Sequence, residues 1–207
     1  LHGHGKEGKN NVCGVVVSEE QGKRIRQVNY DYGRQFAERG YIVIAPDHRN
    51  FGERQYTSER AHGRDTCNLF LLGCLLFNRN PLLANVFDVR RCIDLLQQRE
   101  DVDPERIGAV GLSYGGTMAL WTAALDERVK AACVSCYINT FRAYGIDLDN
   151  TCGVQTPTAL LTIVDEMWEI AALIAPRTLV IENGIRDPGF PIEAARDQHE
   201  KIKRVYE

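Results

Sequence analysis

The sequence lacks an apolar run long enough to cross a membrane, and it lacks an excess of basic residues. Its longest apolar run, LFLLGCLLF at residues 69–77, falls well short of the roughly 20 residues that a transmembrane helix needs. We therefore expect no membrane partner and interpret this run as a buried helix or the wall of an apolar pocket. The net charge of −3 offers no positive field for nucleic acid, so we expect no nucleic-acid partner.

Cysteine usage and nucleotide-binding motifs exclude further classes. The seven cysteines include one Cys-x-x-Cys spacing, at Cys133 and Cys136, but their odd number argues against a complete disulfide framework. Several lie inside apolar segments, where cysteine behaves as a small hydrophobic residue. We therefore expect a reducing compartment and a cytoplasmic protein. The absence of a Gly-x-Gly-x-x-Gly loop after a first strand and of a Walker loop argues against a Rossmann-type nucleotide binder.

What the sequence does contain is an alternation of strand-like and helix-like segments. Continuous apolar runs of strand length lie at 41–47, 106–113, 129–138 and 177–184. Apolar residues at helical spacing lie at 26–39, 81–100, 115–125 and 191–206. This alternation predicts an α/β fold, with a mostly parallel sheet, right-handed crossovers and helices on both faces.

We interpret residues 1–207 as a single domain, since no internal repeat, low-complexity segment or linker interrupts them. Two excursions, at about 48–80 and 137–170, do not fit the alternation. Both follow the carboxyl ends of predicted strands, which is the side of an open α/β sheet where ligands bind. We expect these excursions to form pocket walls or lids.

The stretch RIGAVGLSYGGTMAL, residues 106–120, carries the clearest chemical signal. It places Ser113 in a Gly-x-Ser-x-Gly pattern between an apolar strand and a helix, which is the context of a nucleophile elbow. The sharp turn at such a serine needs small residues two positions before and after it, and Gly111 and Gly115 meet that need. The alternative interpretation is a plain tight turn.

The opening residues LHGHG are typical of a strand end followed by a glycine-opened loop. A hydrolase holds its oxyanion with two backbone N–H groups, and we assign these to His4 and Tyr114. His2 is then expected to stiffen the loop through side-chain hydrogen bonds. The rival interpretation makes His2 and His4 a metal-binding pair, but no third ligand stands at a recognisable spacing.

Five stretches together resemble one known superfamily. They are LHGHG, APDHRNFGER, residues 101–135, residues 170–191 and KIKRVYE. In this order they resemble the α/β-hydrolases, most of all the dienelactone-hydrolase-like and acetyl-xylan-esterase-like branch. The resemblance covers nearly the whole chain. It implies the α/β-hydrolase fold and a serine hydrolase of small carboxylic esters that uses no metal or organic cofactor.

The family order of catalytic residues is nucleophile, acid and histidine, and the resemblance implies Asp187 as the acid. Its role would be to hold the imidazole of the base in one tautomer and to stabilise its protonated form. A turn aspartate before Pro188 is the alternative. Glu182 and Asp165 are weaker candidates for the acid.

None of the five histidines fits the position of the family's base. We expect His48 to brace its loop, His62 to lie on a polar surface, and His199 to lie on the solvated face of the last helix. In the family the base follows one further strand. The resemblance therefore implies that these residues are an internal portion of a longer chain, without the first strands and the last strand, and that the base lies beyond residue 207. Alone they are expected to be nearly inactive, because triad members act as a unit.

The sequence thus predicts a carboxylesterase that works through an acyl-enzyme intermediate. The resemblance implies that its substrates are small, acetyl-type esters. A small-molecule ester is the expected partner. Three alternatives stay open: a lactone hydrolase, a peptidase of the same superfamily, and a catalytically inactive α/β-hydrolase scaffold used for binding.

Overall fold

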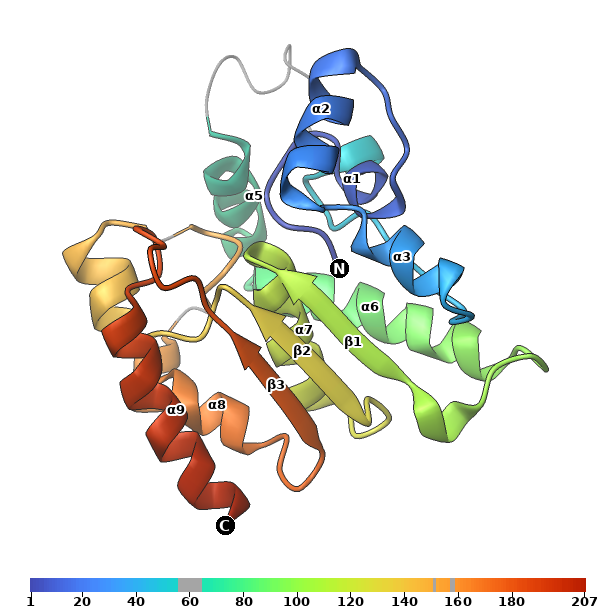
Figure 1. Ribbon diagram of the computed structural model, residues 1–207. Helices are drawn as coiled ribbons and strands as arrows, with labels where there is room; N and C mark the ends of the chain where they lie inside the picture. The colour runs from blue at the N-terminus through green and yellow to red at the C-terminus, as the bar shows by residue number, and fades with distance from the viewer. Residues whose placement is uncertain (56–64, 151, 157–158) are drawn as a thin grey trace.

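The computed structural model contains a three-stranded parallel sheet with helices packed around it (Figure 1). It describes residues 1–55, 65–150, 152–156 and 159–207. The strands β1 (Gly108–Leu112), β2 (Ala131–Ser135) and β3 (Thr178–Glu182) lie in the order β1-β2-β3. Because both pairs are parallel and in register from their first residues, the carboxyl ends of all three strands meet at one edge. These strands confirm three of the four predicted ones.

The helices and short helical turns follow one another along the described residues. The α-helices are α1 (Lys9–Cys13), α2 (Glu19–Val28), α3 (Tyr32–Glu38), α5 (Thr66–Leu75), α6 (Pro81–Gln97), α7 (Tyr114–Leu125), α8 (Met167–Ala172) and α9 (Ile192–Tyr206). The 3-10 turns are η1 (Gly52–Arg54), η2 (Pro104–Arg106) and η4 (Leu160–Thr162), and η3 (Arg142–Asp147) is π-helical. The predicted helices at 81–100, 115–125 and 191–206 correspond to α6, α7 and α9.

Local sequence explains where α6 begins. Asn80 precedes the helix in an extended conformation, and its side-chain oxygen accepts a hydrogen bond of 3.1 Å from the N–H of Leu83. Pro81 occupies the first turn, where the missing N–H of proline costs nothing.

The segment predicted as one helix at 26–39 is two helices instead. Asn29 adopts a left-handed conformation with φ of 53°, and the N–H of Tyr30 donates back to the carbonyl of Ile25. This geometry ends α2, because a left-handed residue cannot continue a right-handed helix. The start of α2 lies earlier than predicted, where the hydroxyl of Ser18 accepts from the N–H of Gln21.

The strand predicted at 41–47 is wrong: these residues form no strand in the structure. Residues 41–46 line a cavity of about 620 Å³ together with residues of β1, so they lie across an open space from the strand that would pair with them. A strand needs a hydrogen-bonding neighbour, and apolar composition alone does not supply one. At the edge of β1 where this strand was expected, Leu1 hydrogen-bonds β1: its amino group donates to the carbonyl of Val110 at 2.7 Å.

The core lies between the sheet and the helices α6, α7 and α8. Helix α7 contacts β1, β2, α6 and α8, and its Met118, Ala119 and Leu120 are fully buried. The opposite face of the strands, which the apolar runs predict to be covered as well, is turned to the viewer in Figure 1 with no described helix in front of it. Val180 of β3 is accordingly 50% exposed.

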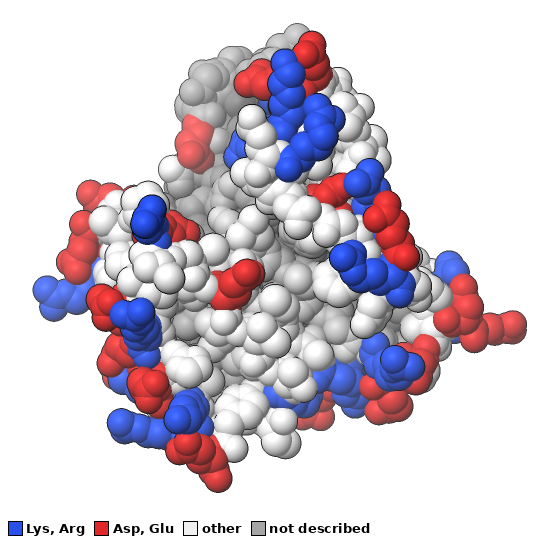
Figure 2. All heavy atoms as spheres, viewed as in Figure 1, with Lys and Arg blue, Asp and Glu red and all other residues white. Residues whose placement is uncertain are grey.

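Charged side chains of both signs lie around the margin of this view, and its centre is largely uncharged (Figure 2). No broad area of a single sign is visible on this face. This distribution agrees with the small net charge of the chain.

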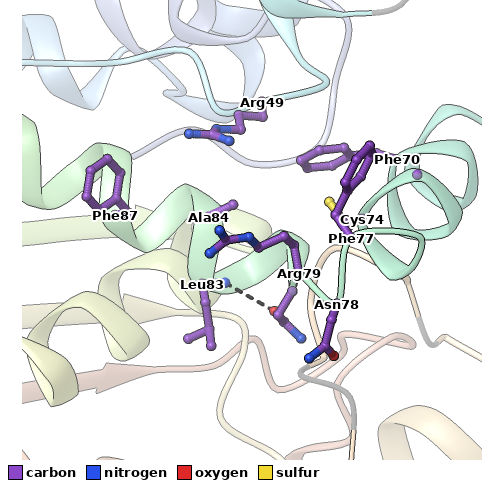
Figure 3. Close-up of a pocket in the computed structure, with 11 residues that line it drawn as sticks. Arg49, Phe70, Cys74, Phe77, Asn78, Arg79, Leu83, Ala84 and Phe87 are labelled. Carbon is purple, nitrogen blue, oxygen red and sulfur yellow. Dashed lines mark hydrogen bonds between the residues drawn. The ribbon is translucent and has the colours of Figure 1, made fainter.

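The apolar run at 69–77 forms most of α5 and the turn after it. It is not buried, since Leu76 and Phe77 are 84% and 78% exposed. Instead it forms one wall of a cavity of about 810 Å³, lined by Phe70, Cys74 and Phe77 of this run and by Leu83, Ala84 and Phe87 of α6 (Figure 3). The run at 69–77 thus lines a pocket, while the role of the whole excursion 48–80 as a wall or lid stays a prediction. Among the helices of the described residues, none combines the length and apolar character needed to span a membrane.

Candidate active site

The site is built at the junction of β1 and α7. Ser113 lies between them with φ of 58° and ψ of −120°, a backbone conformation that is strained for any residue other than glycine. Its N–H donates to the carbonyl of Ser135 at the end of β2, at 2.9 Å, which fixes the turn to the neighbouring strand. Ser113 is partly exposed. The geometry matches the strand, sharp turn and helix of a nucleophile elbow.

The glycines around Ser113 are required by space. A methyl group on Gly111 would collide with the carbonyl of Gly115, and one on Gly115 would collide with the carbonyl of Leu1. A methyl group on Gly116 would lie 2.7 Å from the carbonyl oxygen of Ser135, closer than such atoms approach. The small residues therefore let α7 start directly against the sheet and against the opening loop.

The opening loop lies against the nucleophile turn. A methyl group on Gly3 would lie 3.5 Å from Cβ of Ser113. The loop is held there from α3 and the residues before it: the hydroxyl of Tyr32 donates to the carbonyl of Leu1 at 2.5 Å, and the N–H of Gly3 donates to the hydroxyl oxygen of Tyr30 at 2.9 Å. Residues 1–3 and Ser113 therefore meet at the carboxyl edge of the sheet.

His2 stiffens this loop, as predicted. Its Nε2 accepts from the backbone N–H of His48 at 3.0 Å, which leaves Nδ1 as the donor to the carbonyl of Gly3 at 2.7 Å. Both rings are 1% exposed and their centroids lie 4.4 Å apart. Burial lowers the pKa of His2 to about 4 and holds the pKa of His48 well below its usual range. Both histidines are therefore neutral loop supports near pH 7.

His4 differs from His2 in being exposed. Its ring lies 5.0 Å from the ring of Tyr114 and 5.4 Å from that of Phe51. The structure thus brings together the two residues to which the sequence assigns the oxyanion N–H groups. The Nε2 atom of His4 lies 3.3 Å from Sγ of Cys152.

The side chain of Tyr114 points into the protein. Its hydroxyl oxygen accepts from the side-chain amide of Asn85 at 2.8 Å, and the amide oxygen of Asn85 accepts from the N–H of Arg49 at 2.7 Å. Burial raises the pKa of Tyr114 well above its usual range, so the phenol stays neutral. Sequence reasoning missed Asn85, because nothing near it in the chain marks a partner 29 residues away.

Asp187 lies in the loop after β3, two strands away from Ser113 in the sheet order and at the same carboxyl edge. Its side chain is partly exposed, and Oδ1 accepts from the N–H of Gly189 at 2.8 Å. Of the weaker candidates, Glu182 is exposed in β3, and Asp165 donates from its backbone to Glu169.

No histidine among the described residues hydrogen-bonds Ser113 or Asp187. His199 lies on α9 with its side chain 56% exposed, as predicted. His62, predicted on a polar surface, lies outside the described residues. The part of the chain that the structure describes therefore holds a nucleophile turn, the two assigned N–H residues and a candidate acid, while the base is not assigned.

Comparison with known proteins supplies the family. The model of the family described as acetyl xylan esterase (AXE1) matches residues 15–152, which include the nucleophile turn. The chain belongs to this family. Its α/β-hydrolase fold is confirmed by a crystal structure titled as a "putative acetyl xylan esterase" from Bacteroides fragilis, with a TM-score of 0.79 and 15% identity over 99% of this chain and 54% of that one.

Relatives by sequence agree with the branch that the resemblance indicates. The Bacillus subtilis protein named "Putative hydrolase YtaP" is 32% identical over 169 residues, 81% of this chain and 54% of its own length. The Saccharomyces cerevisiae protein named "Putative carboxymethylenebutenolidase" is 33% identical over 110 residues, 53% of this chain and 37% of its own length. The chain thus spans about half or less of the length of these relatives.

Proposed function

We propose that the protein is a carboxylic ester hydrolase whose nucleophile is Ser113. The observation that carries this proposal is the strained, partly exposed position of Ser113 between β1 and α7, with the opening loop packed against it. A strained backbone persists only where its surroundings enforce it, and such residues cluster at functional sites. Membership of an esterase family supports the same activity.

The reaction would use an acyl-enzyme. The hydroxyl oxygen of Ser113 attacks the ester carbonyl while its proton passes to a base, and the alcohol leaves with that proton. The N–H groups of His4 and Tyr114 hold the negative oxygen of the tetrahedral intermediate. Water then attacks the acyl group, and the carboxylic acid leaves Ser113 regenerated.

Asp187 is our candidate for the residue that orients the base, since it leaves the same edge of the sheet as Ser113. We propose that the base is a histidine outside the described residues. His2 is not suited to the role, because both of its ring nitrogens already have partners in the loop. The cluster in which His48 is buried likewise keeps that ring away from solvent.

Small, acetyl-type esters are the proposed substrates, in keeping with the acetyl xylan esterase family. All seven cysteines are free thiols in the structure, and the cytoplasmic location inferred from cysteine usage stays a prediction.

The test compares an acetyl ester, a lactone and a peptide anilide as substrates of the protein at its full natural length. We expect the acetyl ester to be turned over fastest, and Ser113→Ala to lower kcat by roughly 10⁴-fold or more. The matched control is Ser135→Ala, which changes the serine in register beside the end of β1 and keeps the backbone carbonyl that Ser113 uses. Fast turnover of the anilide alone, or full ester turnover by Ser113→Ala, would overturn the proposal.

A further inference from the structure

Three side chains that are far apart in the sequence meet beside the candidate active site. They are His4 from the opening loop, Cys67 near the start of α5, and Cys152 from the second excursion. The Nε2 atom of His4 and the two sulfur atoms all lie within 4.8 Å of one another, and Nε2 lies 3.3 Å from Sγ of Cys152. Sequence spacing could not show this group, because its members are separated by 63 and 85 residues.

These separations suit a tetrahedral metal ion. Zinc bonds of about 2.3 Å to sulfur and about 2.0 Å to nitrogen place neighbouring ligand atoms roughly 3.5–3.8 Å apart. The three ligand atoms therefore need only small rotamer adjustments to share one ion. Two thiolates and one imidazole are a donor set that zinc accepts, with the fourth position open to water or another ligand.

A polar side chain lies against one of the two sulfur atoms. The side-chain amide of Asn50 donates to Sγ of Cys67 at 3.5 Å. Outer hydrogen bonds of this kind orient metal ligands. Cys67 is 8% exposed while His4 is exposed, so an ion would enter from the His4 side.

His2 has no part in this group. Its two ring nitrogens are already used by Gly3 and His48, and it is buried. The structure therefore separates the two histidines of the opening loop: one supports the backbone, and the other faces two cysteines. The third ligand that the His-x-His spacing fails to supply comes from distant parts of the chain.

We propose that His4, Cys67 and Cys152 form a binding site for one zinc ion. Binding would release the two thiol protons to solvent and leave a site with one open position. The ion would tie the opening loop, α5 and the second excursion together around Ser113, and it would take no part in the ester chemistry proposed above. The inference rests on the cluster and stands independently of the proposed hydrolysis.

The test uses the full chain, reduced and freed of metal, titrated with Zn²⁺ against a chromophoric chelator. We expect one equivalent to bind and the melting temperature to rise on binding. Loss of a residue that hydrogen-bonds a metal ligand lowers the metal affinity roughly 10–100-fold. Cys67→Ser and Cys152→Ser each remove a direct ligand, so each should lower the zinc affinity by at least about 100-fold. With Co²⁺ as probe, the intact chain should show sulfur-to-cobalt charge-transfer absorption, which each variant weakens.

Cys74→Ser is the matched control, since Cys74 lies on the same helix as Cys67 and lines the cavity shown in Figure 3. It should bind zinc as the parent does. His4→Gln changes an exposed side chain, so it serves as a second ligand variant that is expected to fold. Melting in the presence of a chelator checks that every variant is folded.

Two results would overturn the site: no stoichiometric binding by the reduced chain, or equal binding by the parent and the folded Cys67→Ser, Cys152→Ser and His4→Gln variants. Ser113→Ala should bind zinc normally. Failure of the metal site is thereby distinguished from failure of the proposed hydrolase, which is measured by ester turnover.

Discussion

At the scale of single residues, the candidate site depends on backbone atoms that approach unusually closely. Gly111 and Gly115 stand where any Cβ would meet a carbonyl group, and Ser113 holds a positive φ between them. This local constraint is what made Ser113 predictable from the sequence. The glycine pattern, the apolar strand before Ser113 and the helix after it all lie within fifteen neighbouring residues, 106–120.

The first prediction concerns Gly111. Gly111→Ala should lower the free energy of unfolding by about 1–3 kcal/mol, because the added methyl group forces the start of α7 away from β1. The measurement is urea unfolding. The control is Gly73→Ala in α5, where a methyl group would meet no atom within 4 Å. This variant should raise the free energy of unfolding by about 1 kcal/mol or less. Equal effects at the two positions would contradict the steric account.

The second prediction concerns the buried ring of His2. In the unfolded chain its pKa is the ordinary histidine value of 6.5, while burial lowers the folded pKa to about 4. Below pH 6.5 the unfolded state therefore binds the proton and the folded state does not, so stability falls as pH drops from about 6.5 to about 4. At pH 5 the loss from His2 should be about 2 kcal/mol relative to pH 7.5.

Urea unfolding at a series of pH values measures this slope. His2→Gln should flatten the slope between pH 7 and 5, whereas His199→Gln, which changes an exposed residue of α9, should leave it unchanged. An identical slope in the parent and in folded His2→Gln would show that His2 is not the group responsible.

At the scale of elements, prediction succeeded where the signal is local. Helix α6 carries its own cap and a proline in its first turn, and α9 likewise follows a proline. The strand predicted at 41–47 failed because strand formation depends on a neighbour that the local sequence does not supply. The break between α2 and α3 depends on the left-handed residue Asn29, a conformation that asparagine favours but does not require.

The third prediction concerns the turn that joins α7 to β2. Asp126 is 5% exposed and accepts hydrogen bonds from Arg90 of α6 at 3.0 Å and from Arg128 at 2.8 Å. Hydrogen bonds from Arg128 lower the pKa of Asp126 to about 2. Asp126→Asn should therefore cost about 2 kcal/mol of stability, since charged hydrogen bonds are lost at a buried position.

The contribution of Asp126 should be present above its unfolded pKa of 3.8 and disappear as pH falls to about 2, because the folded pKa is the lower one. Urea unfolding of Asp126→Asn at neutral pH is the measurement. Asp101→Asn serves as the control, since Asp101 pairs with Arg99 on the surface and its loss should leave stability unchanged. If the two variants behave alike, the buried pair does not hold α6 to this turn.

At the scale of the whole molecule, the site combines local and long-range parts. The parallel sheet and the nucleophile turn followed from the alternation of segments and from the glycine pattern. The contact of Asn85 with Tyr114 and the meeting of His4 with two cysteines did not, because only the folded chain brings these residues together. Contacts of this kind leave no spacing signal in a single sequence.

The carboxyl edge of the sheet is the part of the molecule on which the proposed function depends. Ser113, the opening loop and Asp187 all lie along this edge.

The most direct measurement is reaction of the protein, at its full natural length, with a fluorophosphonate, followed by peptide mass spectrometry. The account predicts a single phosphonylated peptide containing Ser113, and no labelling of Ser113→Ala. The contradicting result is an unlabelled Ser113 in a folded protein that still hydrolyses esters, or a label that stays in place when Ser113 is replaced.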